Sequence, residues 1–535
     1  MKYLSFILCL FLFVRCTDVI NIQPENDTTY TNYFRTLKDA EALLNTLQMR
    51  VRAMMCQDKE ANPHIFAGEL IDSINVPYIQ GPRELNPKYY TMLRWVRYYE
   101  TINAADLILD NLHRFPLSAE ELRPYELQAY FAKGVAYFML AQRWGEVPIT
   151  KGTTYFGKIG KSSVHDVLEE ATKWAQKALD LPKFEELVDA DGKARGTKQY
   201  GSKGAATALL AHIYAWRAAI EEKPEYWGEA EKYCTQIIEN EVGTYQLAKS
   251  PDAVCTDVLY KNSSESIWEI YRSTEDGVVS MYSLAYVGEM YVGIPTYINV
   301  NYGGPNKYYE FMLFKDRVKR MYEETDLRRD AYFWGLEADK IYVINKNGLL
   351  TPVLTCAPGE AIATYDISNH REAYINKFRH PVFDYDAYNQ TQTFQGCEIC
   401  KVVWRLADIM LLRAECRCRQ NKANATDDLN TIRDRAYGVI AGLSSGTEHH
   451  YKASEGDLQL AIFREREKEL IFEDHRFYDI RRNGVDYVRR ELPKEFGLLS
   501  DEDISNGALY LDVDMNAFTE NDLMRHNVYW NQFLQ

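Results

Sequence analysis

The chain has 535 residues and a formal net charge of −15, from 62 Lys and Arg against 77 Asp and Glu. This acidic balance argues against a nucleic-acid binder, which needs a basic surface to meet the phosphates. The chain is 46% hydrophobic and 26% charged, as globular proteins are, but its 39 Tyr are an excess. Beyond the first residues, no apolar run approaches the roughly 18 residues that a membrane-spanning helix requires.

The first residues predict a secretory signal peptide over 1–15. Lys2 precedes the apolar stretch YLSFILCLFLFV, which is too short to span a bilayer stably. Cys16 follows directly, as at a bacterial lipoprotein cleavage site, although Arg15 stands where such sites prefer a small residue. We therefore expect lipid on Cys16 and a polar tether over residues 16–34. An uncleaved amphipathic anchor is the alternative.

Helical periodicity dominates both ends of the mature chain. It predicts a helix over 125–143, which ends before Gly145 and Pro148. It also predicts helical hairpins that pair 164–180 with 202–219, 202–219 with 226–239, and two helices within 404–436. Small residues stand where two helices must approach closely, a pattern that resembles tetratricopeptide repeats. Residues 240–400 are rich in Gly, Pro, Asn and Tyr and lack this period, so we expect a loop-rich region there.

Four cysteines lie close together in CEICKVVWRLADIMLLRAECRC, residues 397–418, with a spacing near that of a zinc ribbon. The apolar residues around Cys416 and Cys418 follow a helical period, which places these two thiols about 200° apart around the helix axis. They cannot bind one metal ion or form a disulfide with each other. Cys397 and Cys400 could pair, or could be small buried thiols. We expect no metal site here.

The segments that resemble catalytic or metal-binding motifs each lack an essential residue. GTTYFGK at 152–158 resembles a phosphate loop, but Ile159 replaces the Ser or Thr that binds Mg²⁺. The segment 512–522 begins like a calcium loop but lacks the turn Gly and the closing Glu. No GxSxG, HExxH or GxGxxG motif is present. We therefore expect that the protein is not an enzyme and has no cofactor. Sequence spacing does not exclude a pair of carboxylates that hydrolyses glycosides, because such a pair is defined by its separation in space.

The charged run FREREKELIFEDHRFYDIRRNG, residues 463–484, is interpreted as structural. Leu470, Ile471 and Phe472 are predicted to bury one face, while ion pairs form at helical spacing on the other. Those ion pairs would join Glu465, Arg466, Glu469, Glu473 and Arg476. The same spacing logic makes Ser163 and Asp166 a capping box.

Several blocks resemble one known family, SusD/RagB, the outer-membrane lipoproteins with which Gram-negative bacteria capture nutrients. The main blocks are YFMLAQRWGEVPIT (137–150), RLADIMLLRAECRCRQ (405–420), LNTIRDRA (429–436) and ERxxELxFExHRxxDxRRxG (465–484). Weaker matches are WVRYYETINAADLIL (95–109), DLRRDAYF (326–333) and NKFRHP (376–381). The blocks follow the family's order over nearly the whole mature chain. Asp474 departs from the pattern, since the family usually has Gly there.

The resemblance implies a mainly α-helical fold, as one SusD-like domain over 35–535. Tetratricopeptide-like hairpins would occupy about 125–240 and 404–482, with a loop-rich binding region at about 240–400. It implies a lipid-anchored protein on the surface of the outer membrane that binds oligosaccharide without catalysis and delivers it to a SusC-like TonB-dependent transporter. A peptide ligand is the alternative, as in some members, and a glycoside hydrolase is a distant one.

Two Tyr-rich stretches are the predicted ligand site: 282–309, and the loop before the helix expected near 91–110. Sugar rings stack on aromatic side chains, while their hydroxyls need polar partners. The predicted aromatic platform is Tyr78, Tyr286, Tyr291 and Tyr302, and the predicted hydrogen-bonding residues are Asn75, Arg83 and Asn301. The alternative for these tyrosines is that they fill gaps between loops and helices.

Overall fold

The computed structural model describes most of the chain beyond the N-terminal segment. The described residues are 33–56, 68–74, 94–275, 285–291, 298–299, 304–305, 311–386, 391–492 and 496–533. The signal peptide, Cys16 and nearly all of the expected tether therefore lie outside the described residues. The described part is mainly helical, as predicted. None of its helices is long and apolar enough to cross a membrane.

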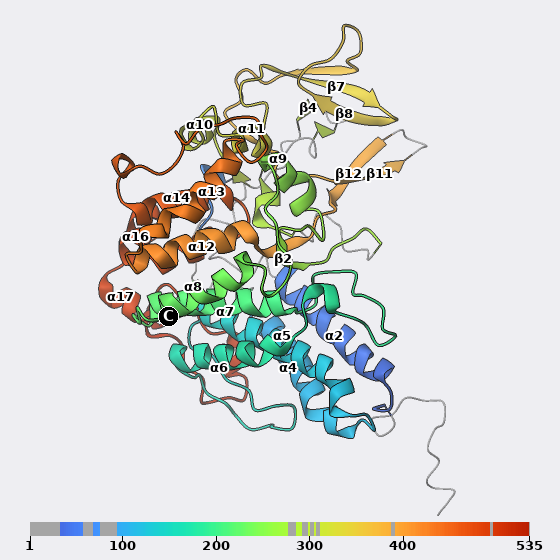
Figure 1. Ribbon diagram of the computed structural model, residues 1–535, viewed down its shortest axis with the longest axis vertical. Coiled ribbons are helices and arrows are strands. Elements are labelled where there is room, and N and C mark those ends of the chain that lie inside the picture. Colours follow the sequence, from blue (N-terminus) through green and yellow to red (C-terminus); the bar gives the residue numbers. More distant parts are fainter. Residues whose placement is uncertain are drawn as a thin grey trace, which may run out of the picture.

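The first half of the chain builds a stack of helices. In chain order they are α2 (Leu37–Cys56), α4 (Val96–Asn111), α5 (Ala119–Arg143), α6 (Val164–Lys177), α7 (Lys203–Ile220) and α8 (Tyr226–Ile238). Each packs on the next, and the pairs α5–α6 and α7–α8 pack most extensively. This stack fills the lower half of Figure 1. The predicted hairpins are therefore present, but α6 pairs chiefly with α5 and only secondarily with α7.

Local sequence explains where these helices begin and how closely they approach. The Ser163 hydroxyl accepts a hydrogen bond from the Asp166 amide at 3.1 Å, which confirms the predicted cap of α6. On α5, a Cβ added at Gly134 would lie 3.1 Å from the Ala175 backbone nitrogen of α6. Helix α7 is buried along almost its whole length through small residues, among them Ala205, Ala206, Ala208, Ala211 and Ala215.

The second half adds α12 (Leu406–Arg419), α13 (Asp427–Ala436), α14 (Leu458–Glu469), α15 (Arg476–Asn483), α16 (Val485–Glu491) and α17 (Asp501–Ser505). Helix α12 packs on α8 and α14, and so joins the two halves into one stack. Cys416 and Cys418 lie on α12, as predicted. All eight cysteines of the described residues are free thiols, Cys397 and Cys400 included. Burial raises the pKa of the Cys397 and Cys416 thiols, which disfavours the reactive thiolate.

The run 463–484 is not one helix. Helix α14 ends at Glu469 and α15 begins at Arg476, and the turn between them contains Phe472 and Asp474, both with φ of +67°. This left-handed conformation is the one that Gly adopts most readily. It accounts for the Gly that the family pattern has where this chain has Asp474.

The middle of the chain contains short strands as well as the expected loops. The longer ones are β2 (Ser266–Ile270), β7 (Lys340–Lys346), β8 (Leu349–Val353), β9 (Ala363–Asp366), β11 (Pro381–Asp386), β12 (Thr391–Cys397) and β13 (Lys401–Arg405). β8, β7 and β9 form an antiparallel sheet, and β11 pairs with β12. In Figure 1 these strands project from the upper right of the helical stack. β13 pairs with β2 and runs directly into α12, so this pair ties the strand region to the helices.

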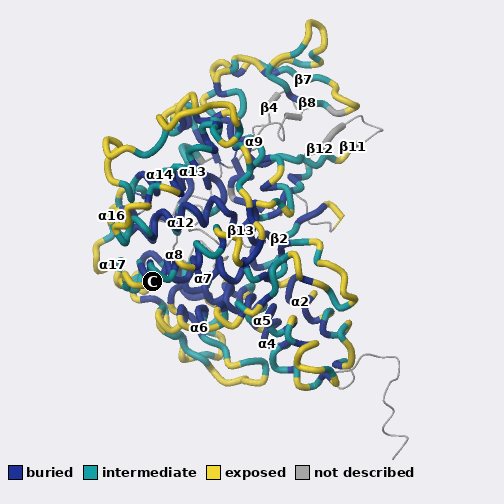
Figure 2. Tube along the Cα trace, viewed as in Figure 1, coloured by how far each residue is buried: buried dark blue, intermediate teal, exposed yellow. Residues whose placement is uncertain are grey.

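Two large apolar clusters hold these parts. The first runs through the helical stack and includes Trp144, Trp216, Trp268 and Trp404. The second, formed largely by residues 254–402, includes Tyr286, Tyr291, Phe311 and Phe378 and receives Phe472 from the turn after α14. Figure 2 shows the buried backbone concentrated along α5, α7, α12 and the β2–β13 pair.

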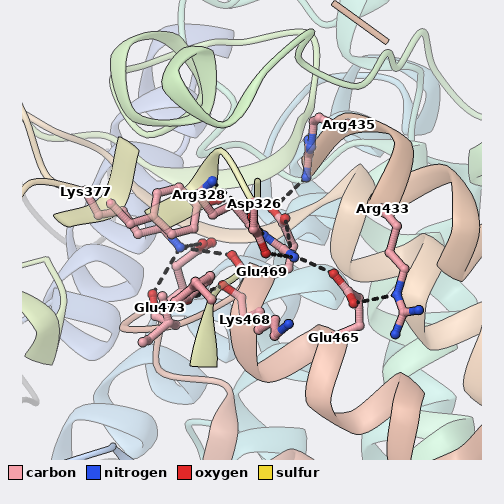
Figure 3. Close-up of polar contacts among 12 residues, drawn as sticks. Asp326, Arg328, Lys377, Arg433, Arg435, Glu465, Lys468, Glu469 and Glu473 are labelled. Atoms are coloured by element: carbon pink, nitrogen blue, oxygen red, sulfur yellow. Dashed lines mark hydrogen bonds and ion pairs between the residues drawn. The ribbon is translucent and has the colours of Figure 1, made fainter. Parts of the chain in front are cut away.

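A cluster of buried charges joins α13, α14 and the start of α12 to segments from the middle of the chain (Figure 3). Its carboxylates and cations come from segments far apart in the chain, and each is at most 3% exposed. We call it the charge cluster; its members are Glu265, Asp326, Arg328, Lys377, Arg405, Arg435, Glu465, Glu469 and Glu473. The predicted ion pairs along one helix face were therefore wrong in partner and in place, because Glu465, Glu469 and Glu473 point into the protein.

Glu469 lies at the centre of the charge cluster. Its carboxylate is 2.6 Å from Arg435, 2.8 Å from Arg405 and 3.4 Å from Arg328. Burial alone would raise the pKa of Glu469, but these arginines outweigh it and hold the pKa well below its ordinary value. Neighbouring pairs complete the cluster, among them Arg328–Asp326 at 2.8 Å and Lys377–Glu473 at 2.6 Å. Glu469 is thus ionised and satisfied by long-range partners.

We expect Glu469→Gln to lower the free energy of unfolding by about 3–5 kcal/mol, because it leaves the buried Arg405 and Arg435 short of a counter-charge. Urea unfolding at neutral pH measures this. The matched control is Glu241→Gln at an exposed position, expected to change stability by no more than about 0.5 kcal/mol. Equal unfolding midpoints for the two variants would contradict the central role of Glu469.

Candidate functional site

The first predicted ligand stretch begins, and the second ends, at one pair of neighbouring strands. Strand β1 (Ser73–Ile74) directly precedes Asn75, and β5 (Phe311–Met312) follows the Tyr-rich stretch. The two strands are antiparallel neighbours, with Ser73 opposite Met312 and Ile74 opposite Phe311. Two segments more than 200 residues apart in sequence therefore begin and end side by side. Asn75, Tyr78, Arg83, Asn301 and Tyr302 themselves lie outside the described residues.

Asp72 fixes this strand pair to the helix that follows it. Its carboxylate accepts hydrogen bonds from the Phe314 amide at 2.8 Å and from the Arg317 Nε at 2.8 Å. Arg317 belongs to α10 (Lys315–Met321), and the Asp72 amide donates to the Met312 carbonyl at 2.9 Å. These charge-assisted bonds hold the base of both loops on a short rigid element.

Tyr286 and Tyr291 are core residues, and each is 1% exposed. The Tyr286 hydroxyl accepts a hydrogen bond from the Val402 amide at 2.6 Å, and its ring stacks on Phe378 with centroids 5.0 Å apart. The prediction that these two rings form a platform for ligand is therefore corrected. A Tyr-rich sequence does not distinguish rings that fill gaps from rings that face solvent, and here the gap-filling alternative holds.

Tyr291 still has a positional role at this site. Its ring packs against Phe311 of β5 and against Phe472, with centroids 5.5 and 4.6 Å apart. Its hydroxyl donates to the Leu70 carbonyl at 3.3 Å. Tyr291 thus links the turn after α14 to the base of both predicted loops.

A hollow of about 340 Å³ lies elsewhere, between α4 and the loop 150–159. Thr153 donates from its amide and its hydroxyl to Asp110 of α4, both at 2.7 Å, which fixes the loop. Tyr155 and Phe156 line the hollow, and Phe156 is 93% exposed. The sequence analysis considered these residues only as a near match to a phosphate loop, GTTYFGK at 152–158, and did not predict the hollow. The hollow therefore carries exposed aromatic groups.

Comparisons with known proteins agree with this architecture. The SusD family model matches residues 239–530, and a model described as "Starch-binding associating with outer membrane" matches residues 27–215. SusD-like protein P2 of Formosa agariphila is 23% identical over 504 residues, which is 90% of each chain. SusD-like protein P25 of the same organism is 38% identical over 87 residues, 16% of this chain and 15% of that one.

Solved structures share the fold. A SusD homolog from Bacteroides thetaiotaomicron superposes with a TM-score of 0.70 at 20% identity and covers 92% of this chain and 98% of its own. B. fragilis NanU gives a TM-score of 0.66 at 17% identity, over 94% of this chain and 99% of its own. The fold is thus that of the SusD superfamily. Since the SusD family model matches more than half of its residues, this chain belongs to the SusD family.

Glu69 gives the base of the loops a pH dependence. Burial, and then the Asp474 carboxylate, raise the pKa of Glu69 from its ordinary 4.5 to about 8. A group whose pKa is higher in the folded state contributes stability at low pH and loses it as the pH rises through the folded pKa. The contribution of Glu69 is therefore lost between about pH 5 and 9.

We expect Glu69→Gln, which cannot ionise, to lose less stability than the unaltered protein as the pH rises from 6 to 9. Urea unfolding at both pH values measures the difference. The carboxylates of the charge cluster do not interfere, because the pKa values of Glu465, Glu469 and Glu473 are all lowered and these groups stay ionised over this range. Parallel pH profiles for the two proteins would contradict the raised pKa of Glu69.

Proposed function

We propose that this chain is a lipoprotein of the outer-membrane surface that binds oligosaccharide noncovalently and delivers it to a SusC-like TonB-dependent transporter. The observation that carries the proposal is membership of the SusD family, together with the match of residues 27–215 to the model described as starch-binding and associating with the outer membrane. SusD-family proteins act as binding proteins, and we propose binding without catalysis. Lipid on Cys16 would anchor the chain.

We propose that the ligand contacts come from the two loops based on the β1–β5 pair. Asn75, Tyr78 and Arg83 follow β1 in sequence, and Asn301 and Tyr302 precede β5. The pairing of these strands supports the idea that both segments serve one site. Tyr78 and Tyr302 would supply stacking area at low entropy cost, and the amides and guanidinium would bond sugar hydroxyls.

We expect Tyr78→Ala and Tyr302→Ala each to weaken glycan binding by about 1–3 kcal/mol with little loss of stability. Calorimetry against panels of oligosaccharides and peptides measures affinity and also tests the alternative of a peptide ligand. Phe156→Ala is the matched control, because it removes an exposed aromatic ring outside the proposed loops. Loss of binding in the Phe156 variant alone would place the site at the hollow, and turnover of a bound glycan would point to a hydrolase.

We expect the mature protein to begin at the lipid-carrying Cys16, which leaves 520 of the 535 residues after removal of 15. Metabolic labelling with a radioactive fatty acid should label the unaltered protein and spare Cys16→Ala. Equal labelling of both would show that Arg15 prevents processing at this position.

A further inference from the structure

Three side chains with metal-binding atoms converge beyond the end of α13. Asp434 lies in the last turn of α13, and the chain returns to it through the loop 437–457. His449 Nε2 is 2.6 Å and His450 Nε2 is 2.8 Å from the same Asp434 oxygen, Oδ1. Within the described part of the chain, this is the group of His, Cys, Asp and Glu residues whose ligand atoms lie close enough to share one ion, all within 4.8 Å of one another.

The surroundings hold the two imidazoles in place. The His449 ring stacks on Tyr437, with centroids 4.9 Å apart and planes at 17°, and meets the His450 ring edge-on at 87°. The His449 carbonyl accepts from Arg433 at 3.1 Å, and the His450 amide donates to the Thr447 carbonyl at 3.0 Å. The rings are therefore positioned by contacts that do not use the Nε2 atoms.

The site is open on one side and is not dominated by the nearby cation. The His449 side chain is 8% exposed, whereas those of His450 and Asp434 are 27% and 26% exposed, which leaves a path for an ion. Arg433 is the adjacent positive charge, but its guanidinium is paired with Glu455 at 3.0 Å and with Glu465 at 2.9 Å. Its repulsion of a bound cation is thereby reduced.

The chemistry of this donor set favours a transition metal. Each Nε2 atom carries a proton when it hydrogen-bonds to Asp434 Oδ1. A single divalent cation bound by the three atoms can replace both protons. Two imidazole nitrogens and a carboxylate suit zinc, nickel and copper, whereas calcium and magnesium prefer oxygen ligands alone. Three protein ligands leave a position for water.

We propose that Asp434, His449 and His450 bind a divalent transition-metal ion of the zinc class. The bound ion cross-links the loop 437–457 to α13, whose Arg433 and Arg435 contact Glu465 and Glu469 of α14. A bound ion therefore links the loop 437–457, through α13, to the charge cluster. The two adjacent histidines stand 15 and 16 residues after Asp434, a spacing that matches no standard metal motif. The site is independent of the proposed glycan binding.

The test uses the full mature chain, made without a polyhistidine tag and stripped of metal with EDTA. Calorimetric titration with Zn²⁺ should show one ion per chain, and Zn²⁺ should raise the melting temperature. His450→Ala and Asp434→Asn should each weaken Zn²⁺ binding at least tenfold. Mg²⁺ should have no effect on any of these proteins.

Two controls keep the proposal testable. His113→Ala, at an exposed histidine outside the cluster, should bind Zn²⁺ as the unaltered protein does. The melting temperature of the metal-free His450→Ala protein shows whether the variant is folded, and limited proteolysis within 437–457 should slow on adding Zn²⁺ only when the site is intact. Absence of Zn²⁺ binding to the unaltered protein, or equal binding by folded His450→Ala, would overturn the proposal.

Discussion

The ion pairs between Glu469 and its arginines are the constraint on which the rest of the structure depends. Arg405 directly precedes α12, Arg435 lies in the last turn of α13, and Arg328 comes from the strand-rich middle of the chain. A carboxylate buried this deeply is stable only when cations compensate the loss of water, so these segments must come together for any of them to be satisfied. The cluster therefore brings α12, α13, α14 and the middle of the chain together at one carboxylate.

The charge cluster also positions the base of the proposed ligand loops. The turn that follows Glu469 carries Phe472 into the second apolar cluster, against Tyr291. Tyr291 in turn contacts Phe311 and the Leu70 carbonyl, where the β1–β5 pair begins. A short series of contacts thus connects the helical scaffold to the loops.

Local features could be predicted from sequence, whereas long-range partners could not. The helix over 125–143, the cap at Ser163 and the helical placement of Cys416 follow from periodicity and spacing within a few residues. Glu465 and Glu469 have the same helical spacing whether they face solvent or face arginines from elsewhere, so their partners were mispredicted. Tyr286 was misplaced for a similar reason, because burial depends on chain segments that sequence does not position. The candidate metal site has no signature spacing at all.

Five of the seven family blocks supply residues of the charge cluster. DLRRDAYF supplies Asp326 and Arg328, NKFRHP supplies Lys377, the block at 405–420 begins with Arg405, LNTIRDRA supplies Arg435, and ERxxELxFE supplies the three glutamates. A buried ion network needs particular residues at a few positions and leaves the others free. The blocks that carry the family resemblance therefore describe the scaffold, and the two stretches that we propose to bind ligand lie outside them.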